Sequence, residues 1–189
     1  MLVTSAVVGE GKTSLATQTA ISLANRGRRT VLVDCSLRRP AVAGVFGLAD
    51  APGVSEYLRG EGELAELVRA TQTGDLSVLP AGRWDRRAVT ALAGEAAAGL
   101  FAELREEYDF VIIDSGPVLT LADTRFISQH ADVALLCVMR DVSQVPKVAQ
   151  TAEILQDFGI DEVEAVVIDA VESGSAAEAP GQPETAAAV

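Results

Sequence analysis

The sequence predicts an α/β fold of three layers, in which helices flank a mostly parallel central sheet. Short apolar runs alternate with segments of helical periodicity, which is the pattern of successive βαβ units. Hydrophobic residues make up 49% of the 189 residues but aromatic ones only 4%, so Ala, Val and Leu supply the core. Small apolar side chains suit helices that pack on a parallel sheet, whose strands are buried on both faces.

The apolar runs place the expected elements along the chain. We expect strands over residues 1–6, 30–35, 76–79, 110–113, 133–138 and 163–168. We expect helices over residues 13–26, 40–46, 55–59, 63–69, 88–98, 100–108 and 145–158. Residues 1–172 form one domain in this prediction. Residues 173–189 are rich in Ala, Pro, Glu and Gly without periodicity, and we expect a disordered tail there.

Composition argues against several classes of function. A net charge of −12 disfavours nucleic acid as a partner, because contacts with its phosphates need a surplus of Lys and Arg. Cys35 and Cys137 fall in apolar runs, which is typical of reduced core thiols in a cytoplasmic protein. The longest apolar run, residues 133–139, is too short to span a bilayer, so we expect no direct membrane insertion.

A glycine-rich turn between the first strand and the first helix predicts a phosphate-binding loop. Residues 8–14 read VGEGKTS, and Gly9 and Gly11 let the backbone curl so that several N–H groups point at one anion. Lys12 is placed to reach the β- and γ-phosphates of a nucleotide, and the Thr13 hydroxyl to ligate Mg²⁺.

Glu10 and Ser14 complete the expected cradle at the start of the helix, where the helix dipole favours an anion. Ala6 stands at the first glycine position of the pattern G-x-x-x-x-G-K-[ST], which is its one departure. The strand before the turn and the helix after it are the context that this pattern requires. The predicted fold is therefore a P-loop NTPase of the Rossmann-like kind, with ATP and Mg²⁺ as its cofactors.

Two aspartates follow apolar strands that we expect to lie in the same sheet. Asp34 closes the strand at 30–35, and Asp114 follows the strand at 110–113. Ligands of an open parallel sheet bind outside the carboxyl ends of its strands, so both carboxylates should lie beside the phosphate loop. Asp114 suits a place in the Mg²⁺ shell. Asp34 suits a bond to metal-bound water or the acceptance of a proton from an attacking hydroxyl.

The sequence resembles the bacterial tyrosine kinases (BY-kinases) of capsular and exopolysaccharide synthesis. Residues 5–13 (SAVVGEGKT), 31–40 (VLVDCSLRRP) and 108–118 (YDFVIIDSGPV) are similar to the Walker A, Walker A′ and Walker B segments of that family. The segments 52–60 (PGVSEYLRG), 76–82 (LSVLPAG) and 131–133 (ADV) continue the likeness, which covers residue 2 to about residue 170. The ending RRP at residues 38–40 is the most family-specific piece.

The resemblance implies a P-loop ATPase fold converted to a kinase that transfers the γ-phosphate of ATP to protein tyrosines. By motif match, Lys12, Asp34 and Asp114 inherit catalytic roles, and Thr13, Asp34 and Asp114 inherit the metal. The resemblance also implies a membrane chain-length regulator (polysaccharide co-polymerase) as partner, which would recruit the protein to the inner face of the plasma membrane. Members of the family assemble into homo-oligomeric rings.

Several positions depart from the family pattern. Ser36 stands where the family usually has a second acid, and a serine supplies no charge. Asp169 stands where an asparagine that helps to hold the adenine is usual, which makes Asp169 a candidate nucleotide contact. The tail after residue 170 has no tyrosine, and we expect Tyr57 and Tyr108 to be packing residues.

No helix is expected before the first strand, where the family carries an arginine-bearing oligomerisation segment. Both a fragment and a shortened gene product are open at this stage.

Arg83, Trp84, Arg86 and Arg87 form a small basic cluster. A solvated loop is the expected reading of it, and docking of an acidic partner or a neighbouring subunit is the alternative.

Three functions stay open from the sequence. The first is a tyrosine autokinase of polysaccharide export, and the second is a weakened nucleotide-binding regulatory module of the same pathway. The third is a septum-positioning or partitioning ATPase of the same fold. Val7 disfavours the third, because it occupies the place of the extra lysine which those ATPases carry.

Overall fold

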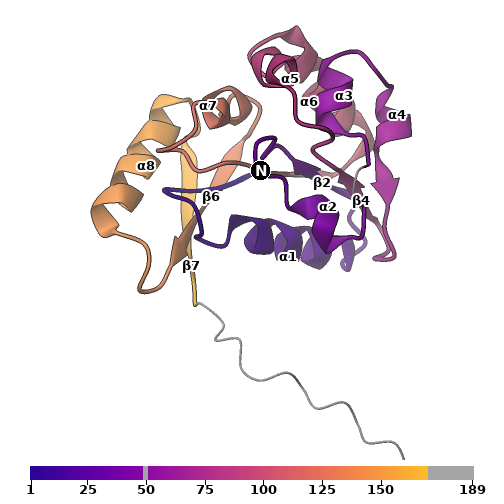
Figure 1. Cartoon of the computed structure of the whole chain (residues 1–189). Coiled ribbons are helices and arrows are strands. Elements are labelled where there is room, and N and C mark those ends of the chain that lie inside the picture. The colour runs from indigo at the N-terminus through magenta and orange to yellow at the C-terminus, as the bar shows by residue number, and fades with distance from the viewer. Residues whose placement is uncertain (49–50, 170–189) are drawn as a thin grey trace, which may run out of the picture.

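Within residues 1–48 and 51–169, which the computed structural model describes, the chain folds around a seven-stranded sheet with helices on both faces (Figure 1). The strands lie in the order β3-β4-β2-β5-β1-β6-β7. Every neighbouring pair is parallel except β3 with β4. This topology confirms the predicted α/β fold with a mostly parallel central sheet.

The strands and helices come in nearly the predicted order along the chain. The strands are β1 (Leu2–Ser5), β2 (Thr30–Asp34), β3 (Arg69–Ala70), β4 (Leu76–Leu79), β5 (Phe110–Asp114), β6 (Val133–Met139) and β7 (Glu162–Ile168). The helices are α1 (Lys12–Ala24), α2 (Val42–Val45), α3 (Val54–Leu58), α4 (Leu64–Leu67), α5 (Arg86–Ala91), α6 (Glu95–Glu107), α7 (Asp123–Ser128) and α8 (Val145–Asp157).

The core lies in two layers, one on each face of the sheet. α1 and α2 cover one face, where Ala16 and Ala20 of α1 pack with Leu32 of β2. The remaining helices cover the opposite face, where Leu100 of α6 packs in one cluster with Ile113 of β5. The alanines let α1 lie close over the central strands, which fixes the position of its N-terminus.

The carboxyl ends of the central strands meet at one edge of the sheet. Asp34 at the end of β2 pairs in register with Asp114 at the end of β5, and Asp114 also pairs with Val3 of β1. On the other side of β1, Ser5 pairs with Cys137 of β6. The expected side-by-side placement of Asp34 and Asp114 is confirmed.

The helices between β4 and β5 break at a different place from the one predicted. The sequence predicts helices over 88–98 and 100–108, but the break falls between α5 and α6. Gly94 takes the extended N-cap position of α6. Gly99 lies inside α6, where a Cβ atom would stand 3.6 Å from the hydroxyl of Tyr57. Gly99 is therefore an internal residue of α6 and not a helix end.

Two short elements are missing from the prediction. The helix expected over 63–69 ends at Leu67, because Val68 is extended and the next residues form β3 beside β4. α7 lies in a stretch for which the sequence predicts no element. Its six residues are too few to show a clear helical period.

The predicted disordered tail, residues 173–189, lies outside the described residues. In the part of the chain that the structure describes, no helix combines the length and the hydrophobicity that crossing a bilayer requires.

Gly53→Ala tests the close contact between α3 and the loop after β4. A Cβ atom at Gly53 would collide with the carbonyl oxygen of Pro80, which accepts the N–H of Val54 over 2.8 Å. We expect Gly53→Ala to lower the free energy of unfolding by roughly 1–3 kcal/mol, measured by urea denaturation. Gly44→Ala is the matched control, because no atom lies within 4 Å of its Cβ position. Equal stability of the two variants would contradict the contact.

Candidate functional site

The segment between β1 and α1 is a tight loop whose glycines adopt left-handed backbone conformations. Gly9 has φ 89° and Gly11 has φ 80°, which a side chain would strain. A Cβ atom at Gly11 would also collide with the side chain of Ile168 and lie 3.3 Å from Met139, so the ends of β6 and β7 press against the loop. α1 begins directly after Gly11, and the N–H groups of its first turn have no intrahelical partner. This backbone is suited to bind a phosphate group.

Thr13 and Asp114 join the start of α1 to the end of β5. Thr13 Oγ1 donates a hydrogen bond to Asp114 Oδ2 over 2.6 Å. Asp114 is fully buried, and its Oδ1 has no hydrogen-bond partner among the described residues. Burial raises the pKa of Asp114 to about 7; the nearby Asp34 adds to the rise, while Thr13 and Lys12 oppose it. A buried carboxylate oxygen without a donor is unfavourable, so this site is suited to a cation.

Lys12 is the first residue of α1, and its side chain lines the cleft described below. Burial lowers the pKa of Lys12, and the charge of Asp114 is the largest of the effects that oppose this. Lys12 forms no salt bridge with another described residue. Its ammonium group is therefore available for an anionic ligand.

Asp34 is fully buried, and its known contacts all run to the backbone of the loop that follows β2. Oδ1 accepts the N–H of Ser36 over 3.0 Å, and Oδ2 accepts those of Ala41 and Val42 over 3.1 Å each. Burial raises the pKa of Asp34, and these three bonds oppose the rise. The structure thus shows Asp34 holding the loop from Ser36 to α2, whereas its catalytic and metal roles stay predictions.

A cleft of about 360 Å³ opens beside the phosphate loop. Its walls come from the loop (Val8, Lys12, Thr13), the segment after β2 (Ser36, Arg38, Arg39) and the segment after β5 (residues 115–121). Ser36 Oγ donates to the carbonyl of Arg39 over 3.2 Å, and Arg38 pairs with Asp123 of α7 over 2.8 Å. The volume is in the range of small-molecule sites, and all three segments contribute polar side chains to the walls.

Glu10, Ser14 and Asp169 take different places around the loop. The side chain of Glu10 is buried beneath the loop, so only its backbone can face a phosphate. Ser14 is exposed in the first turn of α1. Asp169 follows β7 and pairs with Arg140 over 2.9 Å at an exposed position. The contact of Asp169 with a nucleotide stays a prediction.

The donors at this edge fit a magnesium ion. Mg²⁺ prefers oxygen ligands, and Thr13 Oγ1 and the unpartnered Asp114 Oδ1 supply two oxygens close to the expected phosphates. Both oxygens of Asp34 already accept N–H hydrogen bonds, so Asp34 would contact a metal-bound water and not the metal itself. Sequence reasoning missed that the side chain of Glu10 is buried and accepts a hydrogen bond from Ser143 Oγ. These two residues have no local signal in the sequence, because only the fold brings them together.

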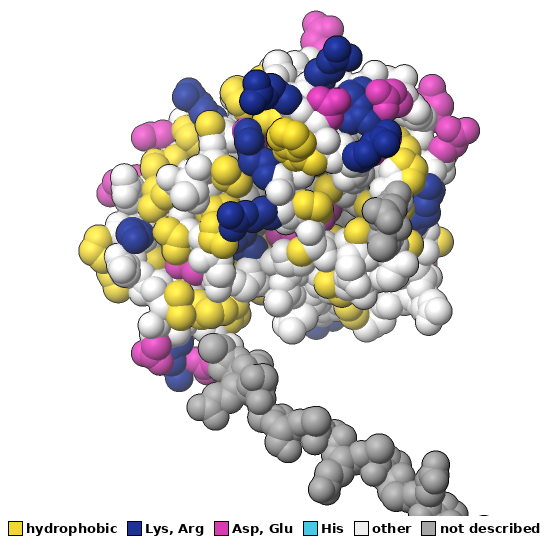
Figure 2. Space-filling view, viewed as in Figure 1, with side chains coloured by type: hydrophobic (Ala, Val, Ile, Leu, Met, Phe, Trp, Pro, Cys, Tyr) yellow, Lys and Arg dark blue, Asp and Glu magenta, His cyan; other side chains and the backbone are white. Residues whose placement is uncertain are grey.

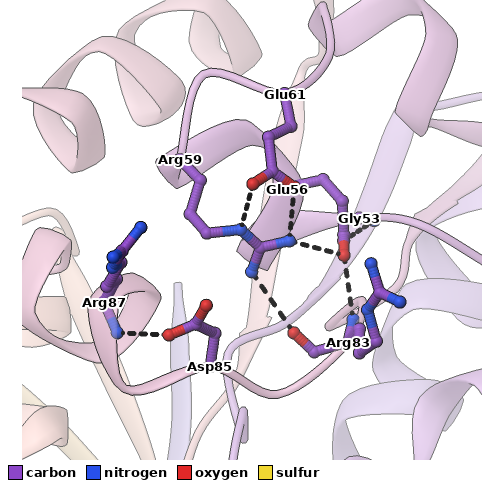
Figure 3. A network of polar contacts seen from close by, with 7 residues as sticks. All are labelled: Gly53, Glu56, Arg59, Glu61, Arg83, Asp85 and Arg87. Atoms are coloured by element: carbon purple, nitrogen blue, oxygen red, sulfur yellow. Dashed lines mark hydrogen bonds and ion pairs between the residues drawn. The ribbon is translucent and has the colours of Figure 1, made fainter.

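A polar network holds the loop after β4 against α3, as Figure 3 shows. The buried carboxylate of Glu56 accepts the N–H of Gly53 over 2.8 Å and that of Arg83 over 3.2 Å. Arg59 bonds both Glu56 and Glu61, over 3.0 and 2.7 Å. The acids of this network therefore lie next to the basic cluster.

The basic cluster is divided between a turn and the start of α5. Arg86 and Arg87 begin α5, and its N-cap Asp85 accepts the N–H of Arg87 over 2.7 Å. Arg83 and Trp84 precede the helix, and Trp84 is 51% exposed. Figure 2 shows basic and acidic side chains intermixed over this part of the surface. Such a mixture favours the predicted solvated surface over a docking site for an acidic partner.

The chain matches known proteins along most of its length. A family model described as an AAA domain matches residues 3–145. The tyrosine-protein kinase YwqD of Bacillus subtilis (strain 168) is 29% identical over 155 residues, which are 82% of this chain and 65% of YwqD. The chain spans 22% of the length of several longer tyrosine-protein kinases. It therefore covers less than two thirds of these relatives.

Solved structures share the same fold. The crystal structure of the VpsO kinase domain has a TM-score of 0.79 and 31% identity, over 88% of this chain and 83% of that one. The cell division ATPase MinD of Pyrococcus furiosus has a TM-score of 0.74 and 24% identity, over 86% of this chain and 68% of that one. The likeness to MinD concerns the fold alone.

Asp114→Asn tests whether burial raises the pKa of the Asp114 carboxyl group, in protein without metal or nucleotide. The pKa of about 7 in the folded protein lies above the ordinary value of 3.8. The folded state therefore holds this proton more tightly than the unfolded chain, and the resulting stabilisation is lost as pH rises from about 4 to about 7. Relative to Asp114→Asn, the wild type should lose on the order of 1–4 kcal/mol of unfolding free energy across this window.

Chemical denaturation at several pH values measures this loss. Asp109→Asn is the control, because Asp109 is an exposed acid whose pKa is lowered by its hydrogen bonds with Arg29. Any effect of Asp109 on stability should be lost as the pH falls through its lowered pKa. A constant difference between wild type and Asp114→Asn from pH 4 to 8 would contradict a raised pKa.

Proposed function

The chain belongs to the AAA domain family and to the kinase domains of the bacterial tyrosine kinases, and we propose that it binds Mg-ATP and transfers the γ-phosphate to protein tyrosines. The observation that carries the proposal is the contact of Thr13 with Asp114 at the start of α1, beside Lys12, which forms no salt bridge within the described part of the chain. A hydroxyl, a carboxylate and an ammonium group there are the groups that a metal-bound triphosphate requires. We further propose that the activity regulates the synthesis and export of exopolysaccharide or capsule.

The proposed roles divide between the loop and the strand ends. The N–H groups of residues 9–14 and the ammonium of Lys12 hold the β- and γ-phosphates. Thr13 and Asp114 would hold Mg²⁺, which when bound neutralises charge on the phosphates. The tyrosine oxygen forms the new bond to phosphorus while the bond to the β–γ bridging oxygen breaks, so ADP leaves. The phenolic proton passes to water in the open cleft, and Asp34 stays a predicted alternative acceptor.

The acceptor tyrosine lies, in this proposal, outside the residues of this sequence. The sequence has two tyrosines, and both are part of the packing of the fold. The hydroxyl of Tyr57 donates to Glu103 over 2.5 Å, and Tyr108 is half-buried beside the same core. A phosphate on Tyr57 would meet the charge of Glu103. Neither side chain is presented as an acceptor.

The relatives suggest the setting in which the domain works. We propose a membrane chain-length regulator as the partner that brings the domain to the inner face of the plasma membrane, and assembly into homo-oligomers. These proposals rest on the likeness to kinases such as YwqD.

A weakened, regulatory form of the same domain is the second candidate. Ser36 favours it, because this residue lines the cleft and donates to the carbonyl of Arg39, where the family usually has an acid. An ATP-sandwich dimer of the partitioning type is disfavoured by Val7. ATP-dependent dimerisation in sedimentation experiments would revive it.

Lys12→Met tests the kinase proposal. With Mg-ATP and a glutamate–tyrosine copolymer as acceptor, we expect the wild type to form phosphotyrosine and Lys12→Met to form it roughly 100-fold more slowly or less. Lys147→Met is the matched control, because Lys147 is the second lysine of the chain and lies in α8. Nucleotide binding without any label that depends on Lys12 would reject the kinase and support the regulatory module.

Ser36→Asp tests the cause of a weakened activity. The new carboxylate would face the cleft beside Thr13, so we expect Mg²⁺-dependent ADP affinity and any phosphotyrosine formation to rise on the order of tenfold. Ser36→Asn has a similar shape without charge, and it should leave both unchanged. Equal behaviour of the Asp and Asn variants would show that charge at this position does not limit the site.

A further inference from the structure

Glu10 lies between the two glycines of the phosphate loop, yet its carboxylate is fully buried. Oε2 accepts the N–H of Val7 over 2.8 Å, and Oε1 accepts a short hydrogen bond from Ser143 Oγ. Val7 is also held from its carbonyl side, because Ser5 Oγ donates to it over 2.7 Å. A buried carboxylate is tolerated only where donors satisfy it, so the loop is built around this side chain.

Ser143 lies 133 residues further along the chain, in the turn between β6 and α8. Its Oγ accepts the N–H of Met139 over 2.8 Å, and its own N–H donates to the carbonyl of Met139 over 2.9 Å. Asp141, within this turn, has φ 62°, a left-handed conformation that a non-glycine residue keeps only where its surroundings hold it. The hydroxyl of Ser143 thus closes the turn and also joins the turn to the phosphate loop.

We propose that Glu10 and Ser143 form a latch that keeps the phosphate loop in its binding conformation before any nucleotide arrives. Both are positioning residues, which act on the ligand through the backbone N–H groups of the loop. Converging N–H dipoles repel one another in the absence of an anion, and a buried carboxylate under the loop counteracts that repulsion. The latch also makes the position of the β6–α8 turn a determinant of nucleotide affinity. This inference rests on the proposed nucleotide binding.

The test has two readouts, which are the amide exchange rate of the loop without ligand and the affinity of the protein for a nucleotide. Hydrogen–deuterium exchange of residues 7–14 is followed in ligand-free protein, and the Kd for Mg-ADP is measured by calorimetry. We expect Ser143→Ala and Glu10→Ala to speed the exchange several-fold and to raise the Kd roughly tenfold, the value of one hydrogen bond to a charged group. Because the two residues share one contact, the loss in the double variant should be smaller than the sum of the two single losses.

Two further variants separate the latch from a general loss of stability. Glu10→Gln keeps a carbonyl for Val7 and offers an amide to Ser143 Oγ, but it removes the charge, so its exchange rate and its Kd should lie between those of the wild type and of Glu10→Ala. Ser128→Ala removes a hydroxyl that bonds only within α7, and it should change neither the exchange nor the Kd. If Glu10→Ala fails to fold, the comparison of Ser143→Ala with Ser128→Ala decides the matter.

Two results would overturn the latch. One is an unchanged exchange rate for residues 7–14 in Ser143→Ala, and the other is a pair of losses that simply add in the double variant. A wild type that does not bind Mg-ADP would reject the proposed function instead. The exchange of the ligand-free loop would still decide whether the latch exists.

Discussion

The hydrogen bond from Thr13 to Asp114 is the contact on which the site depends. It joins the first turn of α1 to the end of β5, which lies between β2 and β1 near the centre of the sheet. The alanine face of α1 and the apolar strands beneath it fix the two ends of this bond. Core packing of α1 on the sheet therefore sets the position of the phosphate loop, and the hydrogen bond from Thr13 to Asp114 holds the start of the helix at the strand end.

Three buried carboxylates lie near the phosphate loop, and they differ in the hydrogen-bond donors that each one has. Asp34 has backbone donors on both oxygens and holds the loop that leads to α2. Glu10 has a donor for each oxygen and lies beneath the phosphate loop. Asp114 has a donor on one oxygen only. An unsatisfied buried oxygen calls for an explanation, and a bound cation is the one that we propose for Asp114.

Much of this arrangement could be predicted from the sequence, because its signals are local. The central strands are predicted by the apolar runs that end in Asp34 and Asp114. The glycine turn before Lys12 predicts the start of the first helix and the edge of the sheet at which it lies. The buried pair of Glu10 and Ser143 could not be predicted, since residues so far apart share no pattern. The break between α5 and α6 was misplaced because Gly94 and Gly99 both lie in an alanine-rich stretch, and the sequence alone does not show at which of the two glycines the helix is interrupted.

The pairing of Asp34 with Asp114 across β2 and β5 has a consequence for the whole molecule. Negative charges on two acids at the ends of adjacent central strands repel one another, and this repulsion contributes to the raised pKa of Asp114. Under the proposed function, a cation bound beside Asp114 would relieve that repulsion, and a ligand that binds only the folded state shifts the unfolding equilibrium by mass action. Under the proposed function, bound Mg-nucleotide should therefore raise the free energy of unfolding of the whole domain, including the elements that never touch the ligand.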